Sequence, residues 1–131
     1  VELEPLPDRV GLDADIALHY ISNITGHGLR KVMRGRNNVT YVVDNIFEPH
    51  LLFDFIQKHT GMSDMEIYST YNMGQDYALF LPEKDVKKAQ AIIKKNKFES
   101  LNAGYVEKGE KQVIIKPKNI IFKGETLQVR G

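Results

Sequence analysis

The sequence contains no cysteine, and its 18 basic and 17 acidic residues leave a net charge of only +1. The lack of cysteine excludes disulfide bonds and thiolate catalysis. Because the charges balance, no global field would attract nucleic acid or an anionic membrane, so any basic character must be local. No apolar run approaches the roughly 20 residues of a membrane-spanning helix, and no signal-peptide pattern opens the chain. We therefore expect a cytoplasmic protein that associates with neither nucleic acid nor membrane.

A length of 131 residues, of which 42% are hydrophobic and 27% charged, is typical of one globular domain with a real core. Residues 1–12 include two prolines and a glycine and are expected to form a lead-in or inter-domain linker before a single domain over residues 13–131. The chain begins with Val1 rather than Met, which together with this stretch predicts a fragment cut from a longer protein.

Hydrophobic periodicity and turn residues predict a mixture of helices and strands. The expected helices cover Asp13–Ile21, Leu29–Arg34, His50–His59, Asp64–Thr70 and Glu83–Asn96. The expected strands cover Val39–Val43, Tyr77–Leu81, Phe98–Val106, Gln112–Lys116, Asn119–Phe122 and Thr126–Arg130. The last long helix lies between two strands, which predicts a βαβ unit, whereas the C-terminal strands follow one another through tight turns and should be antiparallel. The predicted fold is therefore α+β, a mixed, largely antiparallel sheet with helices packed on it.

Two helices carry clear signals at their ends. Ser63 and Glu66 fit a capping box at the start of the helix over Asp64–Thr70. Gly61 is expected to cap the C-terminal end of the preceding helix. That preceding helix is predicted to be strongly amphipathic, with an apolar stripe made of Leu51, Leu52, Phe55 and Ile56.

A short turn of small and polar residues, Ser22–Leu29, carries two glycines separated by one residue. The backbone N–H groups of Thr25, Gly26, His27 and Gly28, with the Thr25 hydroxyl, could cradle a phosphate. The alternative is a plain turn between two helices. The basic side chains that follow could pair with the phosphate or form a solvated face, and because no aromatic residues interleave with them, nucleic-acid binding is disfavoured. These basic residues are Arg30, Lys31, Arg34 and Arg36.

Two motifs about fifty residues apart resemble those of one enzyme family. Asn-Ile-Thr-Gly-His-Gly-Leu at 23–29 resembles the His-Ile-Thr-Gly-Gly-Gly-Leu loop of aminoimidazole ribonucleotide synthetase, the phosphoribosylformylglycinamidine cyclo-ligase. Ser-Asp-Met-Glu-Ile-Tyr-Ser-Thr-Tyr-Asn-Met-Gly at 63–74 is similar to that family's Glu-Met-Tyr-Arg-Thr-Phe-Asn-Met-Gly. The resemblance covers roughly residues 15–107 and only the C-terminal domain of the family, whose α+β fold it implies.

The resemblance implies the substrate-binding half of an ATP-dependent ligase in purine biosynthesis, which closes the imidazole ring of formylglycinamidine ribonucleotide. ATP and Mg²⁺ would bind through an N-terminal domain that this chain lacks, and neither would be bound by this fragment alone. The expected partners are the small ribonucleotide substrate and the protein's own N-terminal domain, in a full-length homodimer. The fragment by itself is expected to be inactive.

The resemblance also assigns site residues. It places the substrate phosphate at Thr25–Gly28 and lines the cleft between domains with Asn72, Met73 and Gly74. Asn23 and His27 are the catalytic candidates, and both depart from the family. Asn23 replaces a His and cannot act as an acid or base near neutral pH, whereas His27 replaces a Gly and could supply a charge-capable donor.

Two further departures follow the second motif. Gln75 and Asp76 stand where the family usually has an apolar residue and Gly. Asp76 could contact a substrate amine or ribose hydroxyl, or it could only cap the turn, and we favour the cap. No metal site is predicted, because the four histidines are not at metal-ligand spacing.

Two alternatives stay open. One is a non-catalytic binding or interaction module of the same fold, which the departures at Asn23 and His27 support. The other is the equivalent domain of a sister ATP-dependent enzyme, such as hydrogenase maturation protein, selenophosphate synthetase or thiamine-monophosphate kinase. The Asn-Met-Gly stretch at 72–74 favours the cyclo-ligase among these enzymes.

Overall fold

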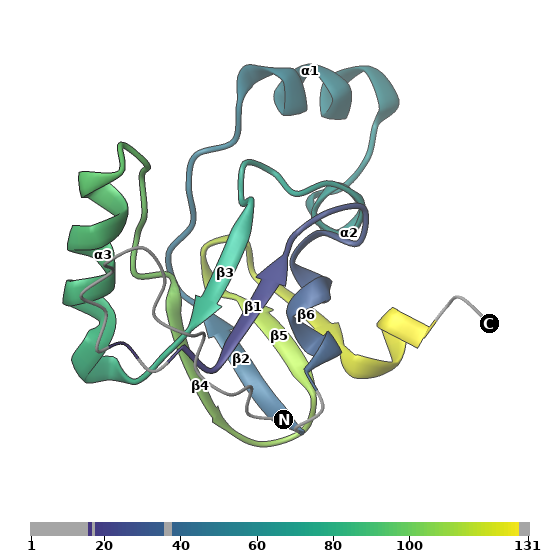
Figure 1. Cartoon of the computed structure of the whole chain (residues 1–131). Coiled ribbons are helices and arrows are strands. Elements are labelled where there is room, and N and C mark those ends of the chain that lie inside the picture. The colour runs from purple at the N-terminus through teal and green to yellow at the C-terminus, as the bar shows by residue number, and fades with distance from the viewer. Residues whose placement is uncertain (1–15, 17, 36–37, 129–131) are drawn as a thin grey trace.

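The computed structural model describes residue 16 and residues 18–35 and 38–128 of the chain (Figure 1). Its strands are β1 (Tyr20–Asn23), β2 (Val39–Val43), β3 (Tyr77–Phe80), β4 (Gly104–Lys108), β5 (Gln112–Ile115) and β6 (Ile120–Lys123). Its α-helices are α1 (Leu51–Thr60), α2 (Asp64–Thr70) and α3 (Val86–Lys95). Four 3₁₀ helices complete the described part: η1 (Gly28–Arg34), η2 (Glu83–Asp85), η3 (Lys116–Lys118) and η4 (Gly124–Gln128). The predicted linker over residues 1–12 lies outside the described residues.

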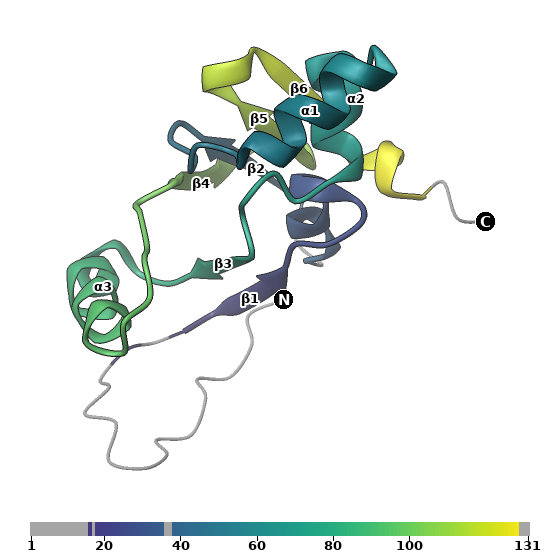
Figure 2. The ribbon, with the colours of Figure 1, turned by 90° about the horizontal axis from the view of Figure 1, so that it is seen from above.

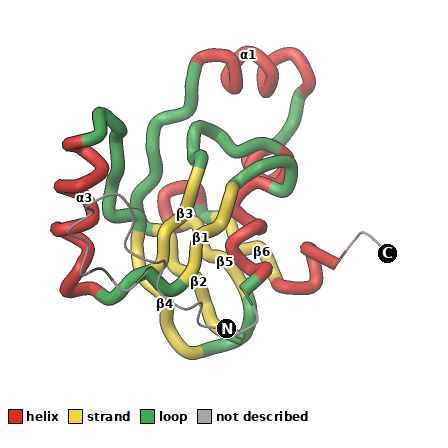
Figure 3. The backbone as a smooth tube through the Cα atoms, viewed as in Figure 1, coloured by secondary structure: helices red, strands yellow, loops and turns green. Residues whose placement is uncertain are grey.

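The strands, yellow in Figure 3, form two separate sheets, which lie apart in the view of Figure 2. The larger sheet has four strands in the order β4-β2-β5-β6, and the smaller is an antiparallel ribbon of β1 and β3. Only the β2–β5 pair is parallel, whereas β2–β4 and β5–β6 are antiparallel. The predicted α+β class, with mixed and largely antiparallel strands, is confirmed.

The predicted βαβ unit is wrong. β3 pairs with β1 and β4 pairs with β2, so α3 connects two different sheets. Figures 1 and 2 show α3 well apart from α1 and α2. β4 and β5 run antiparallel to each other, but they do not pair, because β2 lies between them. The strand predicted over Thr126–Arg130 is instead η4 as far as Gln128, and residues 129–131 are not described.

The helix predicted over Asp13–Ile21 is also wrong at its C-terminal end, where Tyr20 and Ile21 belong to β1. The apolar positions of this stretch fit the alternation of a strand as well as they fit the period of a helix. Tyr20 stacks on Phe80 of β3, with ring centroids 5.3 Å apart, and Ser22 is buried opposite Ala78. Residues 13–15 and 17 lie outside the described part of the chain.

The core fills the space between η1, α2 and the inner faces of β5 and β6. Met33 of η1, Ile67 of α2 and Val113 and Ile115 of β5 are its largest fully buried side chains. The alternation along β5 and β6 directs every second side chain to this core, as the period of a strand requires. η1 and the end of α2 are therefore held against the larger sheet, and the loop that precedes η1 is fixed at one end.

The termini of α1 and α2 follow their sequence signals. The N–H of Glu66 donates to Ser63 Oγ at 3.1 Å, and Gly61 adopts a left-handed φ of 72° while its N–H bonds to Gln57. The apolar stripe of α1 behaves differently. Leu51 and Phe55 are 83% and 60% exposed, and Ile56 is one of the few residues of α1 that pack against the core. The periodicity identified the helix but not which of its side chains the domain covers.

Candidate functional site

The two sequence motifs lie side by side. β1 ends at Asn23, which pairs in register with Tyr77 of β3. One residue further, the Ile24 N–H donates to the Asp76 carbonyl oxygen at 2.9 Å. The loop after β1 and the turn before β3 are thus adjacent, although about fifty residues separate them. Alternation on the ribbon places Asn23 and Tyr77 on its exposed face, opposite to the buried Ser22.

The predicted phosphate loop, Thr25–Gly28, forms a closed turn. The Gly28 N–H donates to the Thr25 carbonyl oxygen at 2.9 Å, so this donor is already engaged inside the turn. Gly28 has φ +56°, and a Cβ there would lie 2.0 Å from the Tyr68 carbonyl oxygen, so packing on α2 requires glycine. His27 adopts an ordinary φ of −105°, so a side chain costs no backbone strain at that position. Phosphate binding by this loop stays a prediction.

The basic residues after the loop divide into different roles. Arg30 donates to three main-chain carbonyl groups, those of His27, Ser69 and Thr126. Burial lowers the pKa of Arg30 from its ordinary value, and the guanidinium links the loop, the end of α2 and η4. Lys31 Nζ lies 3.1 Å from Thr25 Oγ1 and stays at the surface of the loop. Arg36 lies outside the described residues. Arg30 therefore acts within the fold, whereas the Lys31 ammonium lies at the surface beside Thr25.

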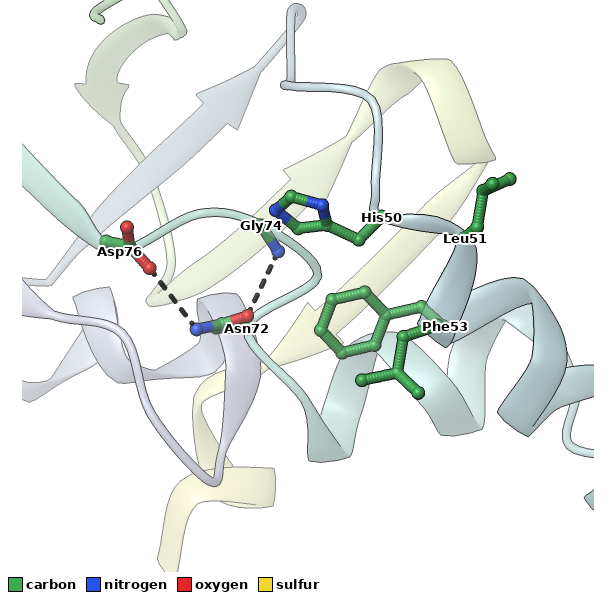
Figure 4. A pocket seen from close by; sticks show the side chains of 7 residues that line it. His50, Leu51, Phe53, Asn72, Gly74 and Asp76 are labelled. Atoms are coloured by element: carbon green, nitrogen blue, oxygen red, sulfur yellow. Dashed lines mark hydrogen bonds between the residues drawn. The ribbon is translucent and has the colours of Figure 1, made fainter. Parts of the chain in front are cut away.

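A surface cavity of about 620 Å³ lies next to the second motif (Figure 4). Its first wall is the turn between α2 and β3, and its second wall is the start of α1. Met73 does not line it, because this residue is 3% exposed and belongs to the core. The cavity therefore has two of the three predicted cleft residues and also several residues that the sequence did not point to. The lining residues are His50, Leu51, Leu52, Phe53, Asn72, Gly74 and Asp76.

The side chain of Asn72 organises the first wall. Its Oδ1 accepts the Gly74 N–H at 3.0 Å, and its Nδ2 donates to Asp76 Oδ1 at 3.4 Å. An asparagine two residues before a glycine is a recognised way to cap a turn. The expectation that Asp76 caps this turn is thus corrected, because Asn72 does so and the Asp76 carboxylate extends to the cavity.

Two contacts join the walls of the cavity. The Gln75 side chain binds the backbone of Phe47, in the segment that leads to α1. The rings of Phe53 and Tyr71 meet at 5.9 Å between centroids. His50 and Phe53 are thereby held opposite Asn72 and Asp76 (Figure 4). Sequence reasoning missed His50 and Phe53, and the polar Gln75 in a position where the resemblance gives an apolar residue was the available signal.

The described residues contain neither a metal site nor a membrane span. Within them, no group of three His, Asp or Glu side chains is arranged to hold a metal ion. The same part of the chain has no helix with the length and apolarity needed to cross a membrane.

Comparison with known proteins agrees with the resemblance. No family model matches the chain. Three archaeal proteins named phosphoribosylformylglycinamidine cyclo-ligase do match it. That of Methanopyrus kandleri is 35% identical over 100 residues, which cover 76% of this chain and 29% of the relative. That of Methanocaldococcus jannaschii is 36% identical over 83 residues, covering 63% and 24%. That of Methanosarcina barkeri is 40% identical over 75 residues, covering 57% and 22%.

The matched region thus corresponds to a domain-sized part of a larger ligase. The chain is therefore similar to part of phosphoribosylformylglycinamidine cyclo-ligase, and its match spans less than a third of the length of these curated relatives.

Proposed function

We propose that this chain is the C-terminal, substrate-binding part of an ATP-dependent ligase that closes the imidazole ring of formylglycinamidine ribonucleotide. The names of the relatives support the ring closure, and the match to only part of their length supports a role as one domain. A cytoplasmic, homodimeric full-length enzyme belongs to the same proposal. Alone, the chain has no turnover.

The observation that carries the proposal is the hydrogen bond from Ile24 to Asp76. It brings the loop at Thr25–Gly28 next to the turn that lines the cavity, so a ribonucleotide can place its phosphate at one and its reacting end at the other. Ring closure of this kind depends mostly on positioning and on stabilising developing charge. ATP with Mg²⁺, when bound, supplies the activation of the formyl oxygen. The residues that bind ATP and Mg²⁺ belong to the part of the ligase that this chain does not match.

A non-catalytic module is the second candidate, and Asn23 favours it. Its side chain is exposed at the end of β1 and, unlike the His of the family motif, cannot exchange a proton near neutral pH. In that case the loop and the cavity bind a ligand without converting it.

Ring-closure assays separate the two candidates. The chain is joined to a segment that supplies the remaining length of a curated relative, and product formation is compared with Asn23→Ala and His27→Gly variants. We expect turnover by the joined protein and none by the 131-residue chain alone. The rate of ring closure should fall at least about tenfold when a donor to the developing charge is removed. Turnover by the isolated chain would contradict the domain assignment. Unchanged rates in both variants would show that the loop is structural, and an inactive joined protein favours the module.

A further inference from the structure

Asp76 is the only acidic residue among those that line the cavity, and it carries the further inference. Its Oδ1 receives one long hydrogen bond, 3.4 Å from Asn72 Nδ2. Among the described residues, Asp76 has no ion-pair partner and its second carboxylate oxygen has no hydrogen-bond donor. The carboxylate is exposed and has no cationic partner among the described residues, so it offers accepting lone pairs at the edge of the cavity.

Asn72 limits how this carboxylate can turn. The Asn72 amide is itself fixed, because its oxygen accepts the Gly74 N–H at 3.0 Å. With Asn72 Nδ2 on Oδ1, the second carboxylate oxygen of Asp76 keeps its lone pairs available to a ligand. Figure 4 shows this pair on one side of the cavity, with the rings of His50 and Phe53 on the other.

The opposite wall favours a flat group. Phe53 is partly buried and its ring is held by Tyr71, so it offers a fixed aromatic surface. The His50 ring makes no hydrogen bond to the described residues and adds a second planar surface. A planar cation gains both from a facing aromatic ring and from a carboxylate that accepts two parallel N–H groups.

We propose that this cavity binds an amidinium group, with the Asp76 carboxylate accepting its two N–H donors and Phe53 and His50 packing against its plane. The inference rests on the proposed function, because formylglycinamidine ribonucleotide carries an amidine at the end that closes into the ring. Asp76 is then the residue that selects the amidine end of the substrate. A ribose hydroxyl would fit the acceptor but would leave the carboxylate charge without compensation.

Benzamidinium chloride tests the inference on the 131-residue chain itself. Backbone amide shifts are followed by NMR during titration with benzamidinium, with the isosteric neutral benzamide and with ribose. We expect benzamidinium to change the amide chemical shifts of His50–Phe53 and Asn72–Tyr77. Benzamide and ribose should leave these shifts unchanged. Asp76→Asn should weaken binding at least about tenfold, since it removes a charge-assisted pair. Glu99→Gln, which neutralises an exposed carboxylate outside the cavity, should bind as the parent does.

Each outcome decides the inference. Equal shifts with benzamide or ribose, or unchanged affinity in Asp76→Asn, would overturn it. Asp76→Ser also removes the carboxylate and replaces the first variant in the titration if that variant does not fold. Binding that depends on Asp76, together with a joined protein that lacks ring-closure activity, would overturn the proposed function and leave the amidinium site standing.

Discussion

Gln75 holds the backbone of Phe47 from both sides. Its Oε1 accepts the Phe47 N–H at 3.2 Å, and its Nε2 donates to the Phe47 carbonyl oxygen at 3.0 Å. The same Nε2 also lies 3.1 Å from the Met73 carbonyl oxygen. One buried amide thus replaces the pairing that a neighbouring strand would give to this segment. The start of α1 is fixed opposite the Asn72–Asp76 turn by this amide, so the cavity depends on Gln75 although Gln75 does not line it.

Gln75→Leu should therefore destabilise the protein by about 1–3 kcal/mol, because it leaves partly buried backbone groups of Phe47 without partners. The matched control is Gln57→Leu, which removes an exposed hydrogen bond to Asp64 and should cost within about 0.5 kcal/mol. Urea denaturation of both variants measures the difference. Equal losses of stability in the two variants would show that water bonds to the backbone groups of Phe47 as well as Gln75 does.

Local signals predicted the helix ends, whereas the βαβ unit and the helix over Asp13–Ile21 were predicted wrongly because they depend on non-local strand pairing. Ser63 and Gly61 act on backbone groups within four residues, so their effect is readable in the sequence. Tyr20 and Ile21 become a strand because β3 lies beside them, almost sixty residues later. No periodicity in a short window distinguishes such a strand from a helix.

The residues that line the cavity were foreseen in the same uneven way. Asn72 and Gly74 do line a cavity, whereas Met73 packs in the core beside them, because adjacent residues of a tight turn face opposite sides. His50 and Phe53 could not be foreseen, since the contacts of Gln75 with Phe47 and of Phe53 with Tyr71 that hold them at the cavity join distant parts of the sequence. The sequence showed a polar residue at Gln75, but it did not show that the backbone of Phe47 is its hydrogen-bond partner.

Arg30 should be more important for stability than for phosphate binding. Its guanidinium donates to the carbonyl groups of His27, Ser69 and Thr126, a fork that the single ammonium of lysine cannot reproduce. Arg30→Lys is expected to cost about 2 kcal/mol in urea denaturation. Arg34→Lys, at an exposed position of the same 3₁₀ helix, should change stability by less than about 0.5 kcal/mol. A large effect at Arg34 with none at Arg30 would contradict this division of roles.

The two glycines of the loop form a matched pair. Gly28→Ala introduces a Cβ about 2.0 Å from the Tyr68 carbonyl oxygen at a positive φ, so both overpacking and backbone strain oppose it. We expect a loss of about 2–4 kcal/mol of stability. Gly26→Ala meets no atom within 4 Å and should be tolerated within about 1 kcal/mol.

Thermal or urea denaturation of the two alanine variants measures the stabilities, and titration with inorganic phosphate measures the loop as an anion site. If the loop binds phosphate through its backbone, Gly26→Ala should weaken that binding while leaving the fold intact. An equally stable Gly28→Ala variant would disprove the close approach of the loop to α2.

Tyr68 should make the protein less stable at alkaline pH. Its hydroxyl is buried and has no hydrogen-bond partner among the described residues. Burial raises the pKa of Tyr68 to about 12, with smaller contributions from the carboxylates of Asp64, Glu48 and Asp54. In the unfolded chain a tyrosine loses its proton near pH 10. Between these values the unfolded state binds fewer protons than the native state, so the free energy of unfolding falls as the pH rises, by up to about 2–3 kcal/mol.

Tyr68→Phe removes both this slope and the unsatisfied hydroxyl. We expect the variant to match or exceed the parent at pH 8 by up to about 1 kcal/mol, and to lose less stability towards pH 11. Urea denaturation across this range makes the comparison, with Tyr77→Phe at an exposed position as the control that keeps the parent's pH dependence. A parallel decline in Tyr68→Phe and the parent would mean that the buried tyrosine is not the source, because every other titrating group is common to both proteins.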